Sequence, residues 1–316
     1  MDETSQNIDV SIIIVSYNNT QILYKTLTSI SDKLRECIYE IIVVDNASTA
    51  GNAEMIHKNF PNIQLIQNSH NVGFGAACNI GVQSATSENI LFLNSDIILL
   101  ENPIPELVKL LRTEPNIGIV GCQLLNNDGT LQPSYYRFPR LWLRFLQLTN
   151  IKKLILFLFP ELRFQHKASI FTVDFVSGAF LFMRRDLFLL VQGFDTDYFM
   201  YTEDADLCFK IKKINYNIVV VNRNFAIHLG EHYEEFDNIF VWEHANKGIL
   251  LFFKKHYSFL KVQALIILSL PSYVFSLIYI LIIKKDVNTR SSILKVMLFY
   301  LRNLISPKNS SFNISK

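Results

Sequence analysis

The sequence places a carboxylate directly after an apolar run, where it could bind a metal ion. Asn94-Ser95-Asp96 follows the run from Ile90 to Leu93. A carboxylate at the end of a strand suits a hard divalent cation such as Mg²⁺ or Mn²⁺. Such a cation takes one or two protein carboxylates and fills its other positions with phosphate oxygens and water. The same triplet also fits an ordinary helix cap, since Ser and Asp both favour that position.

The densest acidic stretch, residues 193–210, contains Glu203, Asp204 and Asp206. If a helix begins near Glu203, Asp204 shares a face with the apolar residues three, four and seven positions further on. That face has to be buried, so Asp204 is carried to the edge of a cleft. A partly desolvated carboxylate is a suitable general base. Stabilisation of the helix dipole would explain Glu203 and Asp206 without any catalytic role.

A glycine-rich turn, NVGFGAACNIG, runs from Asn71 to Gly81. Cys78 stands where a dinucleotide fingerprint needs its third glycine, and the turn follows the third predicted strand, so dinucleotide binding is not expected. Two interpretations stay open. In the first, small residues such as Gly73 let a nucleotide or sugar approach the backbone at a helix N-terminus. In the second, the glycines only let a helix pack closely on a sheet.

His228 follows a predicted strand and precedes Gly230. A neutral imidazole in this position could bind a metal ion. A single histidine near a strand is more often a structural residue, so the sequence alone leaves its role open.

The apolar pattern predicts the elements that must position these residues. Apolar runs, most of them rich in β-branched residues, alternate with segments of helical period. Strands apolar on both faces that alternate with helices indicate a mostly parallel sheet with helices on both sides. Ligands of such sheets bind beyond the carboxyl ends of the strands, where Tyr17, Asp45, Asn71 and Asn94 gather. The predicted strands are 10–15, 38–44, 63–66, 90–93 and 117–121, with 171–183 and 218–221 later, and the predicted helices are 20–31, 52–60, 74–84 and 104–114.

Composition narrows the class of protein. Of the 316 residues 50% are hydrophobic and only 18% are charged, which excludes extensive disorder. The 30 Lys and Arg residues against 28 Asp and Glu give a net charge of +2, which argues against a nucleic-acid partner held by bulk charge. The acidic, polar start predicts no signal peptide. The four cysteines lie far apart, so we expect reduced thiols and a cytosolic catalytic face.

One C-terminal segment, residues 262–283 between Lys261 and Lys284, carries no charge. A helix of this length reaches ~33 Å and would cross a membrane. Pro271 makes a kinked or re-entrant insertion an alternative, and a buried core helix is a third. Basic residues at both ends leave the orientation open. A shorter apolar run, residues 154–159, could lie on anionic lipid.

Six segments, in this order, resemble the inverting glycosyltransferases of family 2, which have the GT-A fold. They are VSIIIVSYNN, IIVVDNAST, NVGFGAACNIG, LFLNSDI, VDFVSGAFLFMRRDLF and GFDTDYFMYTEDADLCFK. The similarity extends from about Val10 to about Gly230 and is closest to the bacterial rhamnosyltransferase-like branch that builds O-antigen and related polysaccharides. It implies an α/β GT-A domain over residues 1–235, with a nucleotide-binding half (about 8–125) and an acceptor half (about 126–235). Residues 236–316 would form a helical, membrane-associated region.

The resemblance also implies a nucleotide-diphosphate sugar donor, Mg²⁺ or Mn²⁺, and a saccharide or lipid-linked saccharide acceptor. Asp204 matches the catalytic base, and Asp96 and His228 match metal ligands. Donor contacts are expected from Tyr17, Asp45, Asn71, Gly73 and Asn94, and sugar or acceptor contacts from Asp174, Gly178, Ala179 and Glu203. Asn94 replaces the first acid of the family's DxD motif, and no Q-x-x-R-W segment follows, which speaks against a processive synthase.

We therefore expect an inverting, metal-dependent enzyme of cell-surface polysaccharide synthesis, with rhamnosyl transfer as one form of the reaction. Its predicted location is the cytoplasmic face of a bacterial membrane, through surface contact or a single insertion. A sugar nucleotidyltransferase is an alternative, although the Ser-Tyr-Asn-Asn turn after the first strand lacks the glycines and lysine that would hold a triphosphate. A non-catalytic nucleotide-sugar-binding membrane protein is the other alternative.

Overall fold

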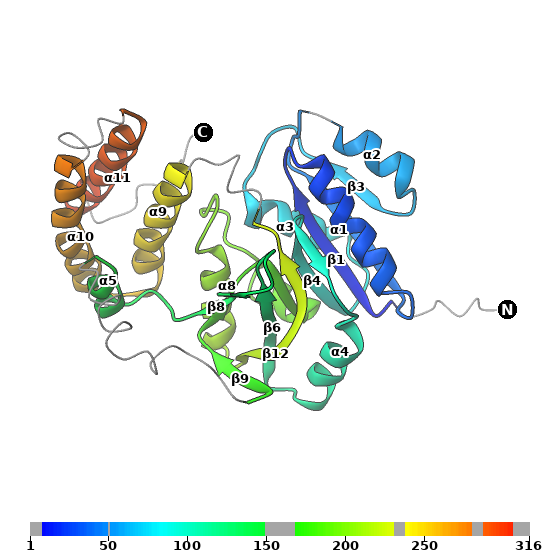
Figure 1. The fold of residues 1–316 in the computed structure, drawn as a ribbon. Helices are drawn as coiled ribbons and strands as arrows, with labels where there is room; N and C mark the ends of the chain where they lie inside the picture. The colour runs from blue at the N-terminus through cyan, green and yellow to red at the C-terminus, as the bar shows by residue number, and fades with distance from the viewer. Residues whose placement is uncertain (1–7, 50, 149–167, 231–237, 280–286, 306–316) are drawn as a thin grey trace. The chain divides into compact units, whose positions relative to one another are not determined.

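The computed structural model describes residues 8–49, 51–148, 168–230, 238–279 and 287–305. The chain divides into two compact units (Figure 1). Unit 1 comprises residues 1–137, 168–199 and 203–232, and unit 2 comprises residues 138–167, 200–202 and 233–316. Unit 2 therefore takes in residues 138–167, which the sequence assigned to the acceptor half. The predicted lipid-facing run 154–159 and residues 280–283 of the apolar segment lie outside the described residues.

Unit 1 is built on a ten-stranded sheet with the order β3-β2-β1-β4-β11-β6-β12-β5, to which β7 and β9 add at β6 and β12. Strands β3, β2, β1 and β4 are mutually parallel, and β12 is parallel to β6. Strand β11 is antiparallel to both of its neighbours, β4 and β6. The strands are β1 Val10–Ser16, β2 Tyr39–Asp45, β3 Gln64–Gln67, β4 Asn89–Asn94, β5 Ile97–Leu99, β6 Ile117–Leu125, β7 Leu131–Gln132, β9 Ile170–Val173, β11 Phe180–Arg184 and β12 Asn217–His228, and a separate pair is formed by β8 Tyr135–Tyr136 and β10 Phe175–Val176.

Helices cover both faces of this sheet. Side chains of α1, α2 and α4 join one buried cluster with alternate residues of the strands. Helix α3 covers the opposite face, where Gly81 lies so close to Ile13 and Val44 that an added Cβ would be 2.6 Å from the Ile13 side chain. The helices of unit 1 are α1 Thr20–Lys33, α2 Asn52–Asn59, α3 Phe74–Ser84, α4 Ile104–Thr113, α7 Arg185–Leu190 and α8 Glu203–Lys213.

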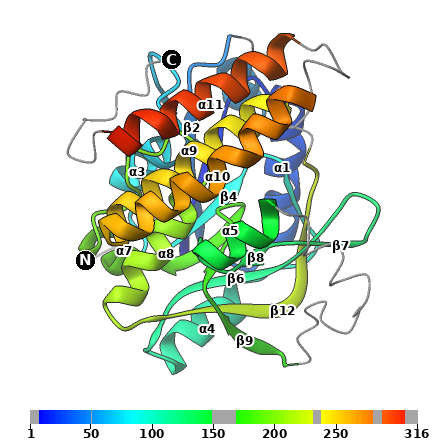
Figure 2. The same cartoon turned by 90° about the vertical axis from the view of Figure 1, so that its left-hand side faces the viewer.

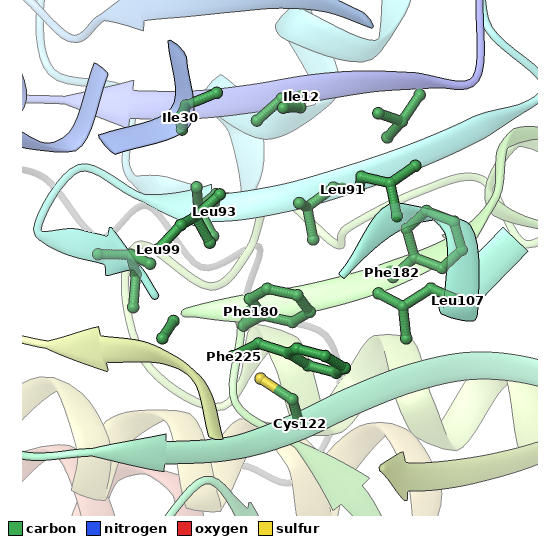
Figure 3. Packing of buried hydrophobic residues seen from close by; sticks show 14 of the residues in the cluster. Ile12, Ile30, Leu91, Leu93, Leu99, Leu107, Cys122, Phe180, Phe182 and Phe225 are labelled. Carbon is green, nitrogen blue, oxygen red and sulfur yellow. The ribbon is translucent and has the colours of Figure 1, made fainter. Parts of the chain in front are cut away.

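The main core lies between the sheet and helices α1 and α4 (Figure 3). Phe180 and Phe182 of β11 are buried there together with Leu91 and Leu93 of β4 and Phe225 of β12. Because side chains alternate across a strand, the intervening Phe92 enters the opposite face, where its ring packs on Phe188 and Phe194. The sheet is thus buried on both sides, as its continuous apolar runs predict.

The predicted mixed α/β fold with a mostly parallel central sheet is confirmed. One predicted strand, 171–183, is wrong as a single element: it divides into β9, β10 and β11. Strand β9 pairs with β12, β10 pairs with β8, and β11 pairs with both β4 and β6. The first break is at Asp174, between β9 and β10. The second is at Ser177-Gly178-Ala179, where the chain leaves β10 and turns into the centre of the sheet. All four cysteines are free thiols, as predicted.

Unit 2 is helical in its described part, with α5 (Leu141–Leu148), α9 (Asn238–His256), α10 (Phe259–Tyr279) and α11 (Val287–Ile305). Figure 2 shows α9, α10 and α11 running side by side. A buried arginine, Arg144 of α5, connects α9 and α10. Its Nη2 donates to Asn246 Oδ1 (2.5 Å) and to the Tyr273 hydroxyl (2.8 Å), and the Tyr300 hydroxyl donates to the Asn246 carbonyl (2.9 Å).

Within the described residues, one helical stretch, Phe259–Ile278 of α10, has the length and apolar character needed to cross a membrane, and 28% of its most apolar window is buried inside the fold. Pro271 lies inside this helix. The C-terminal apolar helix that the sequence predicted is therefore present. Part of it is buried against the rest of unit 2, and the remainder is exposed.

Candidate active site

Asp96 and His228 meet beyond the carboxyl end of β4, at the turn into β5. Asp96 is 1% exposed, and its Oδ1 lies 3.2 Å from Nε2 of His228, the last residue of β12. The Gly230 N–H donates to Asp96 Oδ2 (3.1 Å), and Asn94 Nδ2 lies 3.3 Å from His228 Nε2. Three of the predicted site residues are thus in direct contact, although Asn94 and His228 are far apart in the chain.

Gln132, a residue that the sequence did not point to, determines which ring nitrogen of His228 carries the proton in the neutral imidazole. Its Nε2 donates to Asn126 Oδ1 (2.9 Å) and to the His228 carbonyl (3.3 Å). Its Oε1 is therefore the atom that lies 2.7 Å from His228 Nδ1, and it accepts the Nδ1–H bond. In the neutral imidazole this leaves Nε2 with its lone pair directed towards Asp96.

Asp96 and His228 offer a carboxylate oxygen and an imidazole nitrogen, and both kinds of atom can bind a divalent cation. A carboxylate oxygen and an imidazole lone pair that face each other at 3.2 Å repel unless a proton or a cation lies with them. Two ligand atoms in adjacent octahedral positions around Mg²⁺, each at 2.0–2.1 Å, are about 3 Å apart. Among the described residues no group of three or more His, Cys, Asp or Glu side chains is arranged to hold a metal ion, so phosphate oxygens and water would supply the other ligands.

Asp204 stands in the first turn of α8, as its predicted helix start requires. Its Oδ2 accepts the Gly178 N–H (3.2 Å) and its Oδ1 accepts the Ala205 N–H (2.7 Å). Burial raises the pKa of the Asp204 carboxyl to about 6, while these backbone hydrogen bonds act to lower it. A carboxyl with this pKa is ionised at neutral pH and is still basic enough to accept a proton.

The backbone at Gly178 and Ala179 connects the two acids. The Asn94 N–H donates to the Ala179 carbonyl (3.0 Å), while the neighbouring Gly178 N–H donates to Asp204. Asn94 in turn contacts His228, which contacts Asp96. The carboxylates at 96 and 204 therefore lie at one edge of the sheet and are linked by a short series of direct contacts within unit 1.

The predicted donor residues lie along the same edge, after β1, β2 and β3. Asp45 is buried, and its Oδ1 accepts the Ser48 hydroxyl and the Asn52 Nδ2. Tyr17 follows β1 directly, in a turn that is bonded to the turn after β2. Asn71 Oδ1 accepts hydrogen bonds from Asn46 Nδ2 (2.7 Å) and from the Gly73 N–H (2.9 Å).

Gly73 joins this donor side to the side of Asp204. Its φ is +88°, and the Phe74 N–H donates to the Phe199 carbonyl (3.0 Å). The ring of Phe74 lies over Gly178, where an added Cβ would be 3.1 Å from the ring and 3.8 Å from the Asp204 Cβ. Gly81 packs on the sheet, as the packing interpretation of the glycine-rich turn requires, and Gly73 packs against the Phe199 backbone beside the polar edge.

Two predicted acceptor residues do not join this group. Asp174 forms an ion pair with Lys212 (3.5 Å), which lies eight positions beyond Asp204 on α8 and hence ~12 Å away along the helix. Glu203 is 5% exposed, and its Oε2 has no hydrogen-bond partner within the described part of the chain. Burial, and next the charge of Asp204, raise the pKa of the Glu203 carboxyl well above its usual range.

The chain belongs to a known enzyme family. The profile described as "Glycosyl transferase family 2" matches residues 11–188, more than half of the chain, so the chain is a member of that family and the predicted resemblance is confirmed. Similar proteins include the "Rhamnosyltransferase WbbL" of Escherichia coli K12, which is 29% identical over 71% of this chain and 84% of that protein. They also include the "N-acetylglucosaminyl-diphospho-decaprenol L-rhamnosyltransferase" of Mycobacterium tuberculosis, 25% identical over 70% of this chain and 76% of that protein.

Solved structures confirm the GT-A-type fold. The mannosyltransferase PcManGT of Pyrobaculum calidifontis, solved in complex with GDP-Man and Mn²⁺, covers 96% of this chain and 89% of its own with a TM-score of 0.57 and 16% identity. S. aureus TarS 1–349 covers 93% of this chain and 80% of its own with a TM-score of 0.54 and 16% identity. At these identities the likeness concerns the fold alone.

Replacing Gly73 by alanine should destabilise unit 1, because the new Cβ would be 2.3 Å from the Phe199 carbonyl oxygen and the backbone would have to move. We expect a loss of about 2 kcal/mol or more in the free energy of unfolding and weaker nucleotide binding. Gly129→Ala is the matched control, since Gly129 has φ +80° but nothing within 4 Å of its Cβ position. Equal losses in denaturant unfolding of the two variants would show that the close contact with Phe199 is unimportant.

Proposed function

We propose that the protein transfers a sugar from a nucleotide-diphosphate donor to a lipid-linked saccharide acceptor with inversion at the anomeric carbon. The observation that carries this proposal is the position of Asp204, a partly buried carboxyl with a raised pKa, at the same sheet edge as Asp96 and His228. Family membership supports sugar transfer. The name of the mycobacterial relative, a diphospho-decaprenol rhamnosyltransferase, supports a lipid-linked acceptor and rhamnose as the first donor sugar to test.

In the proposed reaction Asp204 is the general base. It takes the proton of an acceptor hydroxyl while that oxygen forms a bond to the anomeric carbon, and the bond from this carbon to the diphosphate oxygen breaks on the opposite face. One electron pair enters and one leaves, so the configuration inverts. The Gly178 N–H at 3.2 Å and the Ala205 N–H at 2.7 Å hold the carboxylate in place, and a positioned base typically contributes ~10²–10⁴-fold in rate.

Asp96 and His228 are the residues that would hold a divalent cation, with Asn94 beside them and Gln132 orienting the imidazole. A bound Mg²⁺ or Mn²⁺ would offset the negative charge that develops on the leaving diphosphate. Two proteins of similar fold were solved with Mn²⁺, which supports a divalent cation but does not identify its ligands. On the donor side, Asp45 and Tyr17 would contact the base and ribose, and Gly73 would allow close approach of the donor.

The alternatives make different demands on these residues. A sugar nucleotidyltransferase has no need of a general base aimed at an acceptor sugar, and family membership favours transfer. A non-catalytic binding protein would need neither the carboxyl of Asp204 nor its position. The proposed acceptor places the reaction at the cytoplasmic face of a bacterial membrane, which bacterial glycan-building relatives support.

Asp204→Asn should abolish most of the turnover and leave folding and donor binding intact, because the amide cannot accept the proton but fills the same space. We expect a fall of ~10²–10⁴-fold in kcat, measured as transfer from a panel of UDP-, dTDP- and GDP-sugars. Asp197→Asn, an exposed acid of the same acidic stretch, is the control and should retain full activity. Near-normal kcat in Asp204→Asn would remove this residue from the base role.

The pH dependence of kcat/KM should report the ionisation of Asp204. The base is active when ionised, and burial raises its pKa to about 6. The rate constant should therefore fall about tenfold per pH unit below pH 6 and be level above it, until other groups titrate. A profile that stays flat between pH 5 and pH 7 would contradict a base with this pKa.

Gln132→Ala should weaken divalent cation binding without removing a ligand, because the His228 ring loses the contact that fixes its orientation. Loss of such a supporting contact typically costs about 10–100-fold in metal affinity. Titration of Mn²⁺ in the presence of a nucleoside diphosphate would measure this, with the exposed Gln83→Ala as the control. Donor binding that is as tight without metal as with it would exclude the cation from donor binding.

A further inference from the structure

Helix α10 of unit 2 has two apolar faces, and only one of them is covered. The covered face is formed by Val262, Leu265, Ile266, Ser269 and Tyr273. The opposite face is exposed, with Leu260 at 77%, Ile267 at 62% and Phe275 at 71%. We call this face the exposed stripe; its residues are Leu260, Ala264, Ile267, Pro271, Val274, Phe275 and Ile278.

The exposed stripe is unusual for a helix at a protein surface. A surface helix presents polar or charged residues to water on its outer face, whereas all seven residues of the stripe are apolar. They recur every three or four positions from 260 to 278, so the stripe runs ~27 Å along one side of the helix. A continuous apolar surface of this length marks an interaction site.

The covered face prevents α10 from crossing a bilayer alone. Tyr273 and Ser269 lie on that face and contact the guanidinium of Arg144, which also binds Asn246 of α9. Were α10 to span the membrane, it would either leave these contacts or carry Arg144 towards the hydrocarbon, and an arginine at the bilayer centre costs at least about 2.5 kcal/mol. The helix can keep Arg144 and still meet lipid if only the stripe enters the bilayer.

The charge of the chain is divided unequally between the two units. The residues of unit 2 include 17 Lys and Arg against 6 Asp and Glu, a net of +11, and those of unit 1 include 13 against 22, a net of −9. Lys261 is exposed at the start of the stripe, and Arg290 and Lys295 are exposed on the adjacent helix α11. A basic unit with an apolar stripe matches a bilayer that contains anionic lipids, since basic residues near such a surface contribute about 1 kcal/mol each.

We propose that the exposed stripe is a membrane-docking surface: α10 lies in the plane of an anionic bilayer, with its stripe among the lipids and its covered face held by Arg144 in unit 2. This deepens the proposed function, since an acceptor anchored in lipid requires the enzyme to bind at the bilayer surface. Neither a transmembrane span nor a fully packed core helix is needed.

Vesicle binding tests the docking surface. The full chain should co-sediment with phosphatidylcholine vesicles containing 30% phosphatidylglycerol, more weakly with phosphatidylcholine alone, and more weakly again at high salt. The double variant Ile267→Glu/Phe275→Glu should reduce binding by about tenfold or more, because two apolar anchors become charged. Leu190→Glu is the matched control, since Leu190 is 66% exposed on α7 of unit 1, and it should bind as wild type does. Equal binding by all three proteins would overturn the proposal.

Thiol labelling separates an in-plane helix from a span. Ser258 and Ser291 are exposed, and they lie on either side of α10 in the chain. In a Cys37→Ser background, Ser258→Cys and Ser291→Cys should both react with a membrane-impermeant maleimide on intact vesicles. Reaction of one site only, with the other exposed by detergent, would show that the segment crosses the bilayer and would overturn the in-plane arrangement.

Sedimentation velocity of the wild type without vesicles tests whether a second copy of the chain, and not lipid, covers the exposed stripe. A dimer that becomes a monomer in Ile267→Glu/Phe275→Glu would show that a second copy covers the stripe and would overturn lipid docking. A monomer in both cases supports it. None of these measurements depends on turnover. Loss of vesicle binding with normal sugar transfer would reject the docking surface alone. Normal vesicle binding without sugar transfer would reject the proposed reaction alone.

Discussion

The site depends on the burial of one carboxylate at the carboxyl edge of the sheet. Asp96 is 1% exposed, and a charge in that position is tolerated only with compensating contacts. The Gly230 N–H supplies one such contact, from a residue 134 positions further along the chain. The His228 imidazole at the end of β12 adds a second when a proton or a cation lies between it and the carboxylate. This contact joins the two halves of unit 1, and Gln132 fixes the imidazole from a third segment. Asn94 and Asp204 are then placed through the backbone at Gly178 and Ala179.

Much of this arrangement could be predicted from sequence, because local pattern and topology agree. The alternation of apolar runs and helices gave the first four strands and the helices between them, and the carboxyl-end rule brought Asp45, Asn71 and Asn94 to one edge. The inward direction of Asp204 followed from the apolar face of α8. What could not be predicted depends on long-range pairing. Residues 171–183 read as one strand although they form three, and Gln132 lies in a two-residue strand whose contact with His228 no local pattern reveals.

The net charge of the whole chain does not show that the two units carry opposite net charges. The net charge of +2 is the sum of a basic unit and an acidic unit, so the overall value says little about partners. The apolar segment 262–283 posed a similar difficulty, since it contains no charged residue that would distinguish a span from a core helix. The distinction comes from α5, whose Arg144 covers Ser269 and Tyr273 from another part of the chain and leaves the opposite side of the helix bare.

The antiparallel strand at the centre of the sheet also has a consequence for synthesis on the ribosome. Strand β11 separates β4 from β6 and pairs with both, yet it is translated after both of them. Until residue 184 has emerged, β4 and β6 both lack β11, and β6 also lacks β12, which ends at residue 228. Strand edges whose native partners are still missing favour pairing with other chains. Completion of the sheet, and with it of the edge that carries Asp96 and His228, must therefore wait for the last third of the polypeptide. A chaperone that shields β4 and β6 during that interval would raise the yield of native enzyme.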